Sequence, residues 1–265
     1  MAELTTAFGR YTLSKMQDIA ANVGFETVYG DTDSLFICYK DHDTTGITNT
    51  QEFVLKFKHE CNRQLGIEVE HAKTYQTAII SDKKKHYIGW TGIEEKELGI
   101  VGMEGDKNDR PKWINTIFRQ TVHDIFANKD PTINLKKAIS DLESGSVNPA
   151  LLKKSNRLSK NPEEYENEND RKRKIGLVIG ARKGDVIEYY ESDSREGYSL
   201  NPQEVSTRKY KIMLLKTVKD ILEIVGNDIT AIEQGLILNN KDDHMAKPPR
   251  GVVGMLANQF AKSSL

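Results

Sequence analysis

The clearest structural signal in the sequence is FETVYGDTDSLFICY at residues 25–39. Its two flanks are rich in aromatic and β-branched residues, and only Gly30, Asp31, Thr32 and Asp33 separate them. Two strand-forming runs joined by a short turn sequence predict a β-hairpin. Two aspartates are therefore expected at a hairpin tip.

On either side of this stretch, apolar residues at helical spacing followed by glycine predict helices at Leu4–Val23 and Thr50–Leu65. Short strands are expected between Ile67 and Met103, and a mobile polar excursion at Lys153–Lys174. The same patterns predict a strand at Asp185–Glu191 and further helices at Pro111–Phe126, Asn134–Glu143 and Val205–Val225.

Composition excludes several classes of protein. No apolar run approaches the ~20 residues of a membrane span, and the N-terminus shows no secretion signal, so a cytoplasmic protein without a membrane partner is expected. Two cysteines in 265 residues are too few for a disulfide scaffold or a Cys-rich zinc module. The net charge of −1 does not indicate nucleic-acid binding. Two basic runs, Lys83–His86 and Arg171–Lys174, read in isolation as solvated surface.

The hairpin tip suggests metal chemistry. Two carboxylates one residue apart can hold a hard cation such as Mg²⁺, which takes oxygen ligands and is usually bound by one or two carboxylates plus substrate phosphates. In a two-metal site, one ion activates the attacking oxygen and the other stabilises the leaving oxygen. Asp-x-Asp alone is more often ordinary turn chemistry, so its context decides.

That context is a resemblance. Tyr29-Gly30-Asp31-Thr32-Asp33-Ser34 resembles motif C of the family B, or alpha-like, DNA polymerases, and Lys84-Lys85-His86-Tyr87 resembles the family's Lys-Lys-Arg-Tyr motif, with His86 departing from it. Gly102-Met103-Glu104, followed by Lys107, Asn108 and Asp109, resembles a further family element. Gly184-Asp185-x-Ile187-x-Tyr189 and Lys209-Tyr210 resemble the thumb, so that the likeness covers most of Leu4–Ile232.

The resemblance implies roles for particular residues. Asp33 would bind two Mg²⁺ ions, Asp31 would be its weaker companion, and Thr32 between them would contact the nucleotide. Glu70, expected in a strand before the lysines, falls where the family often has a third acidic residue, although an exposed strand glutamate is the alternative. The expected DNA contacts are Lys84, Lys85, Tyr87 and Lys107.

It also implies a fold and its domains. We expect an α+β protein with a partial antiparallel palm sheet and flanking helices, followed by a mostly helical thumb. The palm part, with the motif C hairpin, would be residues 1–80. The thumb would be 81–238, and a flexible tail would be 239–265.

Two parts of the family's site are absent from this sequence, the motif A aspartate and the motif B lysine. The start at Met1 resembles the smaller, C-terminal piece of a split archaeal enzyme; a truncated longer polymerase is the competing explanation. We therefore expect a DNA-directed DNA polymerase subunit that acts on primer-template DNA and deoxynucleoside triphosphates. It would need an upstream chain carrying the exonuclease and motifs A and B.

Other functions stay open at this point. A non-catalytic DNA-binding remnant is the main alternative, although the intact Asp31 and Asp33 argue against it. An unrelated phosphate-handling protein would require several spaced motifs to coincide by accident. A sliding clamp also stays open as a partner, although Met255–Phe260 has one aromatic residue where clamp-binding peptides usually have two.

Overall fold

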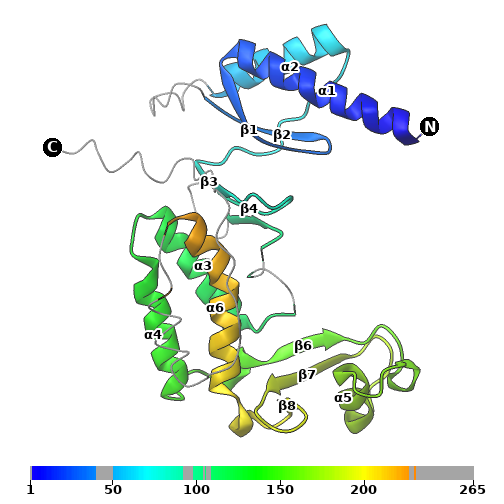
Figure 1. Cartoon of the computed structure of the whole chain (residues 1–265), viewed down its shortest axis with the longest axis vertical. Helices are drawn as coiled ribbons and strands as arrows, with labels where there is room; N and C mark the ends of the chain where they lie inside the picture. Colours follow the sequence, from blue (N-terminus) through cyan, green and yellow to red (C-terminus); the bar gives the residue numbers. More distant parts are fainter. Residues whose placement is uncertain are drawn as a thin grey trace, which may run out of the picture. The chain divides into compact units, whose positions relative to one another are not determined.

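A computed structural model of the chain describes residues 2–39, 50–91, 98–103, 105, 109–226 and 230 (Figure 1). The chain divides into two compact units, each described here by itself. Unit 1 comprises Met1–Gln76 with Lys83–Lys85, and unit 2 comprises Thr77–Asp82 with His86–Leu265. Lys107 and the predicted tail at 239–265, including Met255–Phe260, lie outside the described residues.

Unit 1 is a β-hairpin packed against two helices. Its elements are α1 (Ala2–Val23), β1 (Phe25–Asp31), β2 (Ser34–Tyr39) and α2 (Thr50–Leu65), which confirms the predicted hairpin and both predicted helices (Figure 1). Gly24 follows α1 with φ +107°, a backbone conformation that side-chain-bearing residues rarely adopt. The buried apolar cluster is Met16, Ile19, Ala20, Val23, Phe25, Phe57 and Cys61.

The hairpin contains an irregularity that the sequence pattern does not reveal. Thr27 pairs with Ile37 but Tyr29 pairs with Phe36, so Val28 is an extra residue in β1, a β-bulge. Adjacent residues of a strand point to opposite faces, whereas directly paired residues of two strands share one face. Ile37 packs against the buried cluster, so Thr27 faces the core and Tyr29, with Phe36, faces away from it.

Residues 66–76 correct the expectation of strands starting at Ile67, because none of these residues forms a strand and β3 begins only at Thr77. Ile67 and Val69 nevertheless pack against the apolar cluster of unit 1, while Glu68 and Glu70, which alternate with them, are exposed. The alternation of apolar and acidic residues in this segment is thus explained by packing against helices and not by pairing with a strand.

Unit 2 begins with an antiparallel sheet in the order β3 (Thr77–Ile80), β4 (Tyr87–Trp90) and β5 (Leu98–Val101). Three helices follow it, α3 (Lys112–Phe126), α4 (Pro131–Glu143) and α6 (Thr207–Ile224), close to their predicted positions (Figure 1). Their apolar faces share one core with the sheet. Its fully buried members include Ile88, Ile114, Phe118, Val122, Leu135, Tyr210, Leu214, Val218, Ile221 and Leu222.

The segment between α4 and α6 is a second small sheet with a short helix. Its strands are β6 (Lys154–Arg157), β7 (Val186–Glu191, as predicted) and β8 (Tyr198–Ser199), in that order. The helix is α5 (Arg171–Ile179), and the single turns are η4 (Pro149–Leu152), η5 (Pro162–Glu164) and η6 (Pro202–Glu204).

The predicted mobile excursion at Lys153–Lys174 was therefore wrong. Strand β6, turn η5 and the first turn of α5 form there, because the few apolar residues of this polar stretch find partners on a distant strand. Leu158, Tyr165 and Ile175 are buried in one cluster with Ile187 and Tyr189 of β7.

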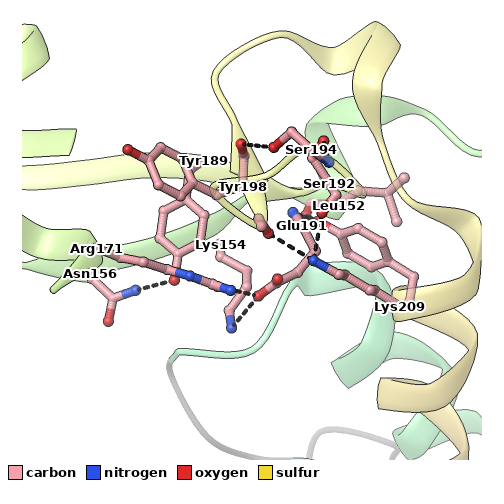
Figure 2. A network of polar contacts seen from close by, with 12 residues as sticks. Leu152, Lys154, Asn156, Arg171, Tyr189, Glu191, Ser192, Ser194, Tyr198 and Lys209 are labelled. Atoms are coloured by element: carbon pink, nitrogen blue, oxygen red, sulfur yellow. Dashed lines mark hydrogen bonds and ion pairs between the residues drawn. The ribbon is translucent and has the colours of Figure 1, made fainter. Parts of the chain in front are cut away.

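The second basic run is also not the solvated surface it resembled. Figure 2 shows Arg171 and Lys154 converging on the buried carboxylate of Glu191, at 2.8 and 3.1 Å. Burial works to raise the pKa of the Glu191 carboxyl, but the hydrogen bond from Arg171 and the charge of Lys154 outweigh it and lower the pKa overall. Lys174 pairs in turn with Glu196 at 2.6 Å.

Tyr210 of α6 joins this cluster to the helical core. Its ring is fully buried, and its hydroxyl accepts a hydrogen bond from the backbone N–H of Glu191 at 3.1 Å. The same hydroxyl donates to the backbone carbonyl of Leu152 at 2.5 Å. One side chain thus ties α6 to both β7 and η4.

Candidate functional site

The candidate site lies at the tip of the hairpin in unit 1. Asp31 is the last residue of β1, and Thr32 and Asp33 form the two-residue turn, with Thr32 at φ +52°. The backbone N–H of Asp33 donates to the carbonyl of Asp31 at 2.6 Å, and the Ser34 hydroxyl donates to the same carbonyl at 3.1 Å. These bonds hold the two aspartates within one closed turn.

The bulge at Val28 decides which way Asp31 faces. With strict alternation, Tyr29 and Asp31 would share the core face with Phe25 and Thr27. The extra residue moves both to the other face, where Tyr29 packs edge-on against Phe36 with ring centroids 5.6 Å apart. Asp31 is consequently kept out of the apolar core, with its side chain 23% exposed, and Asp33 is exposed.

Gly30 leaves room for the side chain of its strand partner Leu35 just before the turn. A Cβ atom at this position would lie 3.1 Å from Cδ2 of Leu35, tighter than ordinary van der Waals contact. A larger residue would require the Leu35 side chain to shift by a few tenths of an ångström beside the turn that carries the aspartates.

Lys85 reaches the same face. It belongs to unit 1 with Lys83 and Lys84, and its backbone is left-handed, at φ +59°. Its backbone N–H donates to the hydroxyl of Tyr29 at 2.8 Å, while its Nζ lies 3.5 Å from Oδ2 of Asp31. Lys85 of the lysine motif is thus connected to the hairpin that resembles motif C by one hydrogen bond and one ion pair.

The Asp31 carboxylate has neighbours at both oxygens. Thr32 donates its hydroxyl to Oδ1 at 3.1 Å, and Lys85 faces Oδ2. The Lys85 side chain is 66% exposed, and such surface ion pairs contribute only about 0–1 kcal/mol. The Asp31 carboxylate is therefore oriented by its neighbours but stays accessible to solvent.

The other predicted residues fall in different places. Lys84 is exposed in the turn beside Lys85, Tyr87 begins β4 in unit 2, and Lys107 is outside the described residues. Glu70 is exposed and is not part of a strand, which corrects its expected position. Within the described ranges no three or more His, Cys, Asp or Glu side chains gather as a metal site, so Glu70 does not join Asp31 and Asp33 here.

Sequence reasoning did not single out Tyr29 as an anchor for the lysine turn. In the sequence, Tyr29 is an aromatic residue next to a glycine and an acidic turn, and its position in a β-hairpin is enough to account for it. The contact with Lys85 spans 56 residues of sequence, and no local pattern encodes it.

The donor set at the tip fits part of a magnesium site. Carboxylate oxygens are the donors that Mg²⁺ takes from proteins, and one or two of them suffice when phosphates complete the coordination. Asp31 and Asp33 match that requirement in residue type and number. They would serve as an incomplete, substrate-completed site.

No helix in the described part of the chain is long and apolar enough to cross a membrane.

Comparison with known proteins agrees with the motifs. The chain is 29% identical over 220 residues to a DNA polymerase of Archaeoglobus fulgidus, covering 81% of this chain and 26% of that protein. It is 26% identical over 214 residues to DNA polymerase 1 of Aeropyrum pernix, covering 74% of this chain and 21% of the relative. The chain thus spans about a quarter of the length of these relatives.

A solved structure shares the fold. The family B DNA polymerase of Pyrobaculum calidifontis matches 86% of this chain and 30% of its own with a TM-score of 0.60, at 21% sequence identity. The α+β class predicted from the sequence is confirmed by this match. The model of DNA polymerase family B matches residues 1–193, nearly three quarters of the sequence, and the chain therefore belongs to that family.

Proposed function

We propose that this chain supplies the motif C aspartates and the DNA-gripping thumb of a DNA-directed DNA polymerase. The observation that carries the proposal is the hairpin tip, where Asp31 and Asp33 sit on a closed turn with a lysine turn against it. Membership of the family and the shared fold support it.

Each candidate residue has a role in this proposal. Asp33, the more exposed carboxylate, binds both Mg²⁺ ions, and Asp31, held by Thr32, assists from the end of β1. Thr32 and Asp33 together face the incoming nucleotide. Bound Mg²⁺ would supply charge stabilisation and alignment for the in-line attack of the primer 3′-hydroxyl on the triphosphate. Glu70 would join the ions only after a rearrangement of residues 66–76.

The DNA contacts are assigned to the lysine turn and its neighbours. Lys84 and Lys85 would contact phosphates and minor-groove edges of the nascent duplex, with Tyr87 beside them in sequence and Lys107 on the primer strand. Such contacts follow the shape of correctly paired DNA and carry little sequence information.

We further propose that an upstream polypeptide completes the site. The relatives are about four times longer than their matched part, and two carboxylates on one turn leave most of the coordination of two ions to other groups. The partner would contribute motifs A and B and the exonuclease, and Mg²⁺, primer-template DNA and deoxynucleoside triphosphates would complete the assembly. A sliding clamp is a further candidate partner of the tail.

Primer extension tests this proposal in three reactions: this chain alone, an upstream fragment of a family member alone, and the two mixed. Extension only in the mixture is expected, and it should require Mg²⁺. The chain with Asp18 replaced by alanine is a matched control, because it loses an exposed aspartate of α1 in the same unit. If the mixture binds primer-template DNA but never extends it, the chain is a DNA-binding remnant and the catalytic proposal fails.

A further inference from the structure

We propose that Lys85 is a positioning residue that exchanges with a divalent cation at Asp31. In this proposal, the Tyr29 hydroxyl holds the backbone of Lys85 where the exchange takes place. The inference rests on the proposed function and extends it, because it links occupation of the carboxylate to the position of a DNA-contacting lysine.

The geometry places Lys85 and the cation in competition for one oxygen. Oδ1 of Asp31 already accepts a hydrogen bond from Thr32, and the Lys85 ammonium faces Oδ2 at 3.5 Å. A divalent cation that takes Oδ2 would meet the ammonium at close range, and two positive charges at that separation repel. The lysine must therefore leave when the cation binds.

Its departure costs little. The Lys85 side chain is 66% exposed, and its long flexible stem can reorient into solvent without disturbing the apolar cluster. By contrast, the backbone stays fixed by the 2.8 Å hydrogen bond to Tyr29, whose ring packs on Phe36. The ammonium is thus released but remains tethered beside the turn.

Release of the Lys85 ammonium from Asp31 changes the charge that Lys85 can offer to DNA. While the ion pair holds, Asp31 partly neutralises the charge that Lys85 would offer to a phosphate. Once a cation occupies the carboxylate, that charge becomes available a few ångströms from the metal. Metal binding and DNA contact by Lys85 would then favour each other.

The test measures Mn²⁺ binding to the isolated full chain at low ionic strength, by electron paramagnetic resonance of the free ion, without DNA or nucleotide. Lys85→Gln should bind Mn²⁺ up to about fivefold more tightly, the range set by a surface ion pair. Lys85→Arg should stay near the parent chain. Lys56→Gln, at an exposed lysine of α2, is the charge-matched control, and it should change affinity much less.

The role of Tyr29 is tested by a variant that alters no charge. Tyr29→Phe should also tighten Mn²⁺ binding, because it loosens the Lys85 backbone, but it should add nothing in the Lys85→Gln background. Such non-additivity is the signature of two residues acting through one interaction. All gains should vanish when Asp31 is replaced by Asn.

Three results would overturn the inference: equal effects of Lys85→Gln and Lys56→Gln, full additivity of Tyr29→Phe with Lys85→Gln, or no Asp31-dependent Mn²⁺ binding in any variant. Because no polymerisation is measured, a failure of primer extension with the Mn²⁺ pattern intact would refute the proposed function alone. Extension without that pattern would refute only the exchange.

Discussion

The hydroxyl of Tyr210 makes two hydrogen bonds whose loss should lower the stability of unit 2. Replacing Tyr210 by phenylalanine keeps the ring in its fully buried place and removes a single oxygen. That oxygen is the acceptor for the N–H of Glu191 and the donor to the carbonyl of Leu152, so two backbone groups lose a partner at once.

The cost follows from leaving buried groups unsatisfied. Each such group costs about 1–3 kcal/mol, and two of them suggest a loss of about 2–4 kcal/mol after local relaxation. For a folding unit of this size, that loss corresponds to a drop of roughly 5–15 °C in melting temperature. The loss should fall on the unfolding transition of unit 2.

Urea unfolding followed by far-ultraviolet circular dichroism checks the magnitude. Tyr190→Phe is the matched control, because Tyr190 is also buried in unit 2 and its hydroxyl bonds to no residue within the described ranges. The control should change stability by less than about 0.5 kcal/mol. If Tyr210→Phe were no more costly than the control, the hydroxyl would not tie α6 to β7 as described.

Three further predictions concern charge and burial. Replacing Lys84 and Lys85 together by alanine should weaken primer-template binding and reduce its log–log salt slope by up to about two; an unchanged slope in filter-binding titrations would place both on a solvated face. Burial raises the pKa of the Glu191 carboxyl, but the hydrogen bonds and charges of Arg171 and Lys154 together outweigh it and lower the pKa overall. The contribution of the carboxylate to stability should therefore be present above the ordinary carboxyl pKa and be lost as pH falls through the lowered folded value. Melting of the parent chain and Glu191→Gln from pH 7 to pH 3 should therefore converge at the acidic end, and a constant gap would contradict this. The Cys61 thiol, whose pKa is raised to about 11 mainly by burial, should resist alkylation at pH 8 until the chain is unfolded, as mass spectrometry of the labelled protein would show.

Local patterns predicted the elements whose periodicity is strong. The hairpin at residues 25–39 and the helices at Leu4–Val23 and Thr50–Leu65 each form close to the expected bounds, because their apolar residues recur at the right spacing and glycine ends both helices. The candidate aspartates were found at the hairpin tip for the same reason.

Features that depend on distant partners could not be predicted. The bulge at Val28 breaks the alternation from which strand faces are inferred, so the outward direction of Asp31 was invisible in the sequence. The polar stretch from Lys153 is ordered by packing against β7, which begins more than 30 residues later in the chain. Arg171 is half-buried because it pairs with Glu191 of that strand. Composition alone classifies such segments as solvated, although tertiary contacts determine their structure.

Single-turnover primer extension by the reconstituted enzyme tests the claim that the hairpin tip holds the catalytic metal ions. Asp33→Ala should lower the extension rate at saturating Mg²⁺ by at least about 100-fold, with Asp31→Ala less damaging and Asp18→Ala at the parent rate. Primer-template affinity should stay within about twofold of the parent in Asp33→Ala and Asp18→Ala, because neither substitution removes a residue to which a DNA contact is assigned. Extension by Asp33→Ala at the rate of Asp18→Ala, with assembly intact, would contradict the claim.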